Sequence, residues 1–139
     1  MVLNTGVSSQ GIPIAQIVVS VMQYTPEDPN KSGLTIPYKS FTPNSASQAD
    51  YNSITKDYPG TWVKAFCYVY RCDAFLDTDV LLSERRNAIR KATTHEMGHA
   101  LSLKHPSSLT TPAVMQQGYD ENYNLRYYDT HYLKEKWGT

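Results

Sequence analysis

The chain has little of what usually identifies a compartment or a large partner. Its 139 residues include only two cysteines, and 13 basic side chains balance 13 acidic ones, so the formal net charge is zero. Two cysteines do not identify a redox compartment, and balanced charge gives no electrostatic footprint for nucleic acid or an anionic membrane. No apolar run approaches the roughly 20 residues of a membrane span. We therefore expect one domain with its own core, monomeric, with neither nucleic acid nor membrane as a partner.

Other shortages bear on the fold and on its location. The chain has three phenylalanines against 11 tyrosines, which suits a fold with half-exposed, polar faces. Cys67 and Cys72 would face opposite sides of one strand because side chains alternate, so we expect two free thiols; only a tight turn between them would allow a disulfide. The chain does not open with the basic and then apolar residues of a signal peptide, and the sequence leaves the compartment unknown.

Histidine is also rare, but three of the four histidines fall within residues 95–105. His95 and His99 are separated by about 400° of helical rotation, so their rings point the same way. His105 follows six residues later and completes the cluster if the chain turns sharply. Three imidazoles leave one position of a tetrahedral zinc open for water, which is the catalytic arrangement. Glu96 directly follows the first histidine and can reach that water.

This segment resembles the metzincin signature His-Glu-x-x-His-x-x-Gly-x-x-His, which is followed by a Met-turn. Met115, in Pro-Ala-Val-Met, matches that methionine. The resemblance is to matrixin-like, small bacterial-type zinc endopeptidases, and it covers roughly residues 66–138. It implies an α+β, metzincin-like zincin fold in which a small twisted mixed sheet packs on an active-site helix. The expected parts of a single catalytic domain spanning 1–139 are the zinc-binding helix and motif at 83–105, the Met-turn loop at 107–119 and a C-terminal helix at 129–137.

The resemblance also implies the chemistry. His95, His99 and His105 would bind one zinc ion as neutral imidazoles. Glu96 would act as the general base that activates the zinc-bound water and then as the acid that protonates the leaving amine. Met115 would form a hydrophobic base under the histidines without touching the metal. The expected activity is therefore zinc-dependent hydrolysis of peptide bonds.

Two residues depart from the family pattern. Ser102 stands where the family has a glycine that ends the helix and reverses the chain. A left-handed conformation there would cost a serine about 1–2 kcal/mol, although the turn could also be made with a negative φ. Tyr119 lies four residues after the methionine, whereas some metzincins place a metal-binding or transition-state tyrosine at two. Tyr119 is thus a weak site candidate, and a core or pocket-lining role is the alternative.

The substrate is expected to be a peptide or protein bound in extended form. In the family the peptide adds to an edge strand through main-chain hydrogen bonds, and Trp62–Tyr70 is either that strand or its neighbour. The resemblance suggests a secreted protein. A calcium ion stays unsupported, because a calcium site needs six or more oxygen ligands and the spacing of the candidate acids matches no known loop. Those candidates are Asp73, Asp77 and Asp79.

Three alternatives remain open. Glu121, 22 residues after His99, could replace His105 as third ligand, as in another group of His-Glu-x-x-His peptidases, although its surroundings resemble a loop. The chain could be a catalytically inactive zinc domain that binds peptides or proteins. A structural zinc module would need a fourth protein ligand, for which no obvious residue exists. We interpret His131 as a surface or core histidine.

The remaining segments give a coarse map of the elements. Apolar residues from Pro13 to Met22 recur with helical spacing, which predicts a helix, although their β-branched side chains favour a strand. Short strands are expected at 34–41 and 49–54. Ser83 is the expected N-cap of the histidine-bearing helix, whose inward face carries small residues, and Gly98 would let it approach the sheet. In the last helix we expect three core-facing residues, Tyr132, Leu133 and Trp137, with Gly138 past its end.

Overall fold

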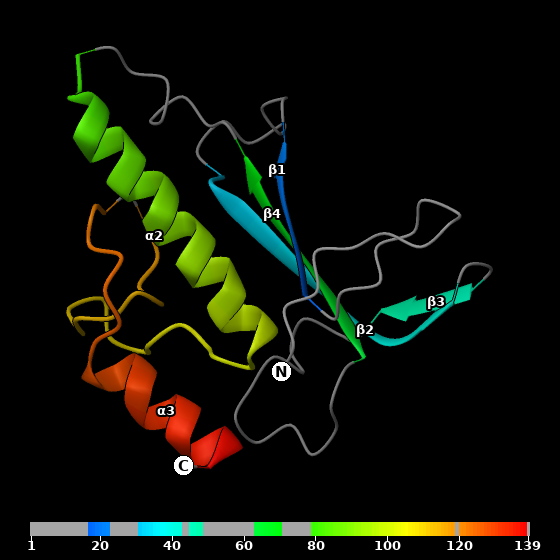
Figure 1. The fold of residues 1–139 in the computed structure, drawn as a ribbon. Helices are drawn as coiled ribbons and strands as arrows, with labels where there is room; N and C mark the ends of the chain where they lie inside the picture. Colours follow the sequence, from blue (N-terminus) through cyan, green and yellow to red (C-terminus); the bar gives the residue numbers. More distant parts are fainter. Residues whose placement is uncertain are drawn as a thin grey trace.

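The computed structural model describes residues 17–22, 31–42, 45–48, 63–70, 79–118 and 120–138. These residues form a four-stranded mixed sheet and two helices, an α+β arrangement as expected (Figure 1). Neither helix is long and apolar enough to cross a membrane. Several predictions concern residues outside the described ranges, namely the strand at 49–54, Cys72, Asp73, Asp77 and Tyr119.

The sheet has the order β1-β4-β2-β3, with bounds Ile17–Met22, Lys64–Tyr70, Gly33–Thr42 and Ser45–Gln48 in that order. β1 runs parallel to β4, whereas β2 is antiparallel to both of its neighbours, β4 and β3. The strands predicted at 34–41 and 62–70 correspond to β2 and β4. β4 lies between β1 and β2, so it is an interior strand and not an edge.

The predicted helix from Pro13 to Met22 is wrong in its described part, because Ile17–Met22 forms strand β1. All six residues of β1 pair with β4, from Ile17 opposite Ala65 to Met22 opposite Tyr70. The apolar spacing fits a helix, but pairing with a neighbouring strand satisfies the backbone and suits β-branched side chains better. Pairing with β4 therefore outweighs the helical spacing of the apolar residues.

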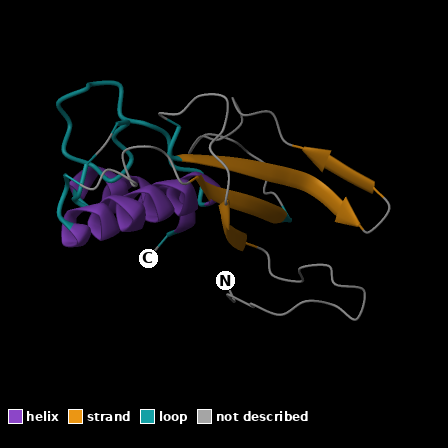
Figure 2. Cartoon of the chain, turned by 90° about the horizontal axis from the view of Figure 1, so that it is seen from above, coloured by secondary structure: helices purple, strands orange, loops and turns teal. Residues whose placement is uncertain are grey.

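Helix α2, Leu82–Ala100, packs against the sheet through its small side chains. Ala88 and Ala92 contact Val69 of β4, and Ala100 joins a second cluster with Ala65 and Cys67. Cys67 is a buried free thiol. Alanines at these positions let the helix lie close to the strands, as predicted from the pattern. Both views place the helices to one side of the strands (Figures 1 and 2).

The two helix ends that sequence alone assigned are each off by a few residues. Leu81, and not Ser83, is the N-cap of α2, and it makes no side-chain capping bond. Helix α3 spans Tyr127–Trp137 and so begins two residues before the predicted start. Gly138 ends α3 with φ 77°, as expected.

The inner face of α3 confirms two of its three predicted core residues. Tyr132 and Leu133 are half-buried and pack on the cluster formed by Leu103, Ala113 and Met115. Trp137 is instead 51% exposed, so its prediction as a core residue is wrong. It lies in the last turn, where its indole N–H donates to the carbonyl of Leu101 at 2.8 Å. This bond ties the end of α3 to the end of α2.

Candidate metal centre

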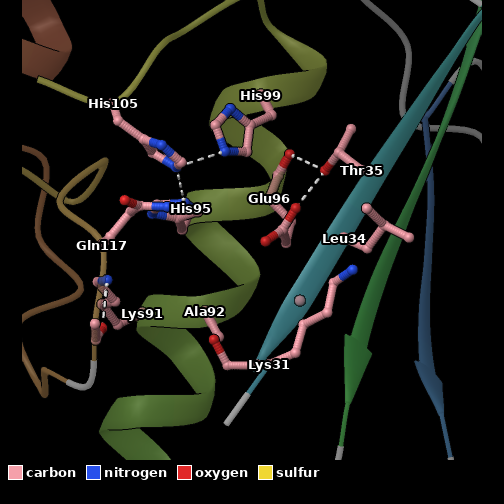
Figure 3. A pocket seen from close by; sticks show the side chains of 13 residues that line it. Lys31, Leu34, Thr35, Lys91, Ala92, His95, Glu96, His99, His105 and Gln117 are labelled. Carbon is pink, nitrogen blue, oxygen red and sulfur yellow. Dashed lines mark hydrogen bonds between the residues drawn. The ribbon is translucent and has the colours of Figure 1, made fainter. Parts of the chain in front are cut away.

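The three histidines of the motif converge on one point beside α2 (Figure 3). His105 Nε2 lies 3.0 Å from His95 Nε2 and 3.1 Å from His99 Nε2. Nitrogens bound to one tetrahedral metal at about 2.0–2.1 Å would lie about 3.3 Å apart. The cluster is therefore compact enough to hold a single metal ion.

Hydrogen bonds at the far side of two rings assign their tautomers. His95 Nδ1 lies 2.9 Å from the carbonyl of Val114, and His99 Nδ1 lies 2.8 Å from the carbonyl of Leu103. A carbonyl only accepts, so each Nδ1 carries the ring proton and each Nε2 presents a lone pair. His105 can donate one proton to at most one of these lone pairs. A cation at the point of convergence would satisfy all three nitrogens, so the donor set fits a metal ion.

Burial keeps these imidazoles neutral. It lowers the pKa of His95 to about 3, with the neighbouring His99 adding to the effect, and the pKa of His99 to about 4. The pKa of His105, which is half-buried, is also lowered by desolvation. A metal ion binds only the neutral form of the ring. The site therefore presents metal-ready ligands near neutral pH without first losing protons.

A left-handed turn at Ser102 brings His105 to the other two histidines. Ser102 has φ 71° and is the one non-glycine residue with positive φ in the described part of the chain. Its N–H donates to His99 and the N–H of Leu103 donates to Gly98, both at 2.9 Å, which is a Schellman motif. Serine thus takes the conformation that glycine would take more easily, and the sharp reversal required for His105 is formed.

Met115 lies under the cluster, packed against the helix. It is 1% exposed, and a Cβ added to Gly98 would meet its sulfur. Gly98 therefore makes room for Met115 and not for the sheet, which corrects the role expected for this glycine. Met115 packs with Leu103 and Ala113 in an apolar cluster. Its position matches the hydrophobic base that the resemblance implies.

Asp129 supports this arrangement from helix α3, and sequence reasoning missed it. Its fully buried carboxylate accepts the N–H groups of Val114 at 2.9 Å, Met115 at 3.2 Å and Arg126 at 2.8 Å. The carbonyl of Val114 is the group that orients His95. Asp129 therefore holds the peptide that positions a ligand. The one signal in the sequence is the spacing of Arg126 and Asp129, which are three residues apart as in a capping box.

Glu96 is buried between α2 and the start of β2. Thr35 Oγ1 lies 2.7 Å from Glu96 Oε2 and 2.8 Å from the Glu96 carbonyl (Figure 3). A Cβ on Gly33 would meet the Glu96 carboxylate, so glycine leaves the room this side chain occupies. Burial raises the pKa of Glu96 to about 7, although the bond with Thr35 opposes the shift. A carboxylate with this pKa can both accept and release a proton near neutral pH.

The three histidines and Glu96 line a cavity of about 460 Å³ between β2, α2 and the end of the 107–119 loop. Lys31, Gly33 and Thr35 come from the start of β2 and the residues before it. Lys91, Glu96 and the histidines come from the motif region, and Gln117 and Gly118 from the loop. Segments far apart in the sequence thus meet at the histidine cluster. The cavity that they enclose gives a bound molecule access to the histidines.

The remaining candidates lie away from the cluster. Glu121 is exposed and is not part of the metal-ligating group, so His105 takes the third position among the described residues. His131 is half-exposed and lies 3.8 Å from Glu135 on the surface of α3, which agrees with the surface interpretation. Asp79 is exposed and does not join the group either.

No protein-family description, curated protein or solved structure matches this chain.

Proposed function

We propose that this chain is a zinc-dependent endopeptidase of the metzincin type. The observation that supports it most is the convergence of three imidazole Nε2 atoms beside a buried glutamate in one open cavity. Three nitrogen ligands and a free fourth position suit a catalytic zinc, whereas a structural zinc would need a fourth protein ligand. The Schellman turn and the buried Met115 also agree with the metzincin resemblance.

In this proposal the residues divide the work. A zinc ion held by His95, His99 and His105 would polarise the scissile carbonyl and lower the pKa of a water molecule. Glu96 accepts the proton of that water and later delivers it to the leaving amine. Thr35 holds the Glu96 carboxylate in place through its hydroxyl. The Val114 and Leu103 carbonyls fix the His95 and His99 rings.

The edge of β2 beside the cavity would receive the substrate. The carbonyls of Ser32 and Tyr38 accept hydrogen bonds from the N–H groups of Tyr70 and Val63, on the β4 side. Backbone groups alternate in direction along an antiparallel strand, so those of Gly33, Thr35 and Pro37 point to the opposite edge of β2. Strand β3 pairs with β2 only from Tyr38 onward, and no other described strand covers this edge. An extended peptide could bond there to the backbone of Gly33 and Thr35.

Metal content and cleavage of a mixed peptide library test the proposal together. We expect one zinc per chain by elemental analysis and chelator-sensitive cleavage by the wild type. Glu96→Ala should keep the zinc and lose at least about 100-fold in rate, because general acid–base catalysis contributes on the order of 10²–10⁴. His131→Ala, a histidine outside the cluster, is the matched control and should change neither quantity.

Other results have clear meanings. Normal cleavage by Glu96→Ala, or cleavage unaffected by the chelator, would refute the mechanism. Zinc without cleavage in either protein would favour the inactive, peptide-binding alternative. Loss of zinc in Glu121→Ala but not in His105→Ala would assign the third ligand to Glu121.

A further inference from the structure

Lys91 is a buried cation in the cavity that the mechanism above does not use. It is only 5% exposed, and its ammonium lies 2.5 Å from the Gln116 carbonyl and 3.0 Å from the Gly118 carbonyl. No described carboxylate forms an ion pair with it. An ammonium has three protons to donate. Two therefore serve the loop backbone, and one remains for a group that enters the cavity.

The cavity around Lys91 is positively biased. Among the described residues that line it, Lys31 and Lys91 are the cations and Glu96 is the one carboxylate. Glu96 is already engaged by Thr35 at the β2 side of the cavity. Figure 3 places Lys91 on the same helix as His95 and His99, near Gln117 and away from Thr35. Among the described residues, Asp120, Glu96 and Asp129 act on the Lys91 ammonium through their charge, but none of them forms an ion pair with it.

We propose that Lys91 selects peptides that carry an acidic side chain on a residue adjoining the cleaved bond. This inference rests on the proposed peptidase function. Lys91 precedes His95 by one helical turn, about 6 Å along the axis. Neighbouring residues of an extended peptide are about 3.3 Å apart, and a glutamate side chain covers the remaining distance. Its carboxylate would form a charge-assisted bond with the ammonium, which a neutral side chain cannot match.

The test uses two synthetic heptapeptide pools that are random except for a central Glu or a central Gln. Mass spectrometry counts cleavages at the bonds adjoining the central residue. We expect the wild type to cut beside Glu at least about 10-fold more often than beside Gln, the difference typical of a charged against a neutral hydrogen bond. Lys91→Gln should bring this ratio close to one, whereas Lys91→Arg should keep it above one. Lys134→Gln, the same change at an exposed position on α3, should leave the ratio unchanged.

The ratio between pools separates recognition from support of the loop. Because Lys91 also holds two loop carbonyls, its loss could slow cleavage of every peptide, but such a slowing affects both pools alike. Binding of both pools to the Glu96→Ala protein, followed by fluorescence anisotropy, gives a second measurement that requires no turnover. The Glu pool should bind more tightly, and this preference should disappear in the Glu96→Ala, Lys91→Gln double variant.

The outcomes distinguish this inference from the proposed function. Cleavage by the wild type with equal frequency beside Glu and Gln overturns the role of Lys91 and leaves the peptidase intact. An undiminished Glu preference in Lys91→Gln overturns it as well. Tighter binding of the Glu pool without any cleavage refutes the peptidase function, and supports acidic recognition by Lys91 if the preference disappears in the double variant.

Discussion

Ser102 shows what a single side chain costs in a turn that favours glycine. Its φ of 71° lies in the left-handed region, where a Cβ approaches the following carbonyl oxygen. The residue is buried, and its turn joins the second and third ligands of the histidine cluster. The protein therefore keeps local backbone strain directly beside its candidate metal centre.

Replacing this serine should relieve the strain. We expect Ser102→Gly to raise the free energy of unfolding by about 1 kcal/mol, because glycine adopts positive φ without steric penalty. Thermal unfolding of the metal-free protein would measure the change. Ser102→Ala, which retains the Cβ, is the control and should bring no gain. A lower melting temperature for Ser102→Gly would mean that the serine side chain stabilises the fold by more than the backbone strain destabilises it.

At the scale of elements, α3 acts on the candidate metal centre through the loop that carries Met115. Asp129, in its first turn, accepts three backbone N–H groups, and two of them belong to the Met-turn. The same Met-turn supplies the carbonyl that orients His95. The angle of α3 and the direction of one imidazole are thus linked through a single carboxylate.

Asp129→Asn should weaken both the fold and zinc binding. An amide oxygen can still accept, but the NH₂ group would face backbone donors inside the core, so we expect a loss of about 1–3 kcal/mol in the free energy of unfolding. Zinc affinity should fall by roughly 10–100-fold, the effect typical of residues that support metal ligands. Denaturant titration and a competitive zinc chelator would measure the two effects. Lys134→Gln, a change of an exposed side chain on the same helix, should leave both values unchanged.

At the scale of the whole molecule, the pH dependence of stability follows from two opposing buried groups. The folded pKa values of about 3 for His95 and 4 for His99 lie below the value of roughly 6.5 expected in the unfolded chain. The unfolded chain therefore binds more protons as the pH falls below about 6.5, and stability decreases. Glu96, with a folded pKa of about 7, stabilises the fold as the pH falls from about 7 toward 4.5.

The histidines outnumber the glutamate, so we expect the metal-free protein to lose stability between about pH 7 and pH 5. Urea unfolding in the presence of a chelator would measure it. Glu96→Gln removes the opposing titration, and the decrease should then be steeper. If that variant were equally stable at both pH values, the histidines would not be buried in their neutral form.

The local part of the site could be predicted from sequence, and the long-range part could not. His95 and His99 lie one helical turn apart, so their spacing alone brings their rings together. His105 joins them through the turn at Ser102, which directly follows the helix. Thr35 reaches Glu96 across 61 positions of the chain, and no pattern in the sequence marks such a contact. The strand β1 was missed for a related reason, since its pairing with β4 is a tertiary contact that overrides its helical spacing.

Pro37 has a consequence for how the protein behaves among its own copies. An uncovered strand edge is a template on which identical chains can pair and aggregate. Pro37 lacks an N–H group and lies on the outward-facing row of β2, directly before β3 covers the rest of that strand. Among the described strands, the uncovered part of the β2 edge is thus limited to a few backbone groups beside the cavity. That stretch is long enough to hold a short peptide, whereas Pro37 removes one of the N–H donors with which a second copy of β2 could pair.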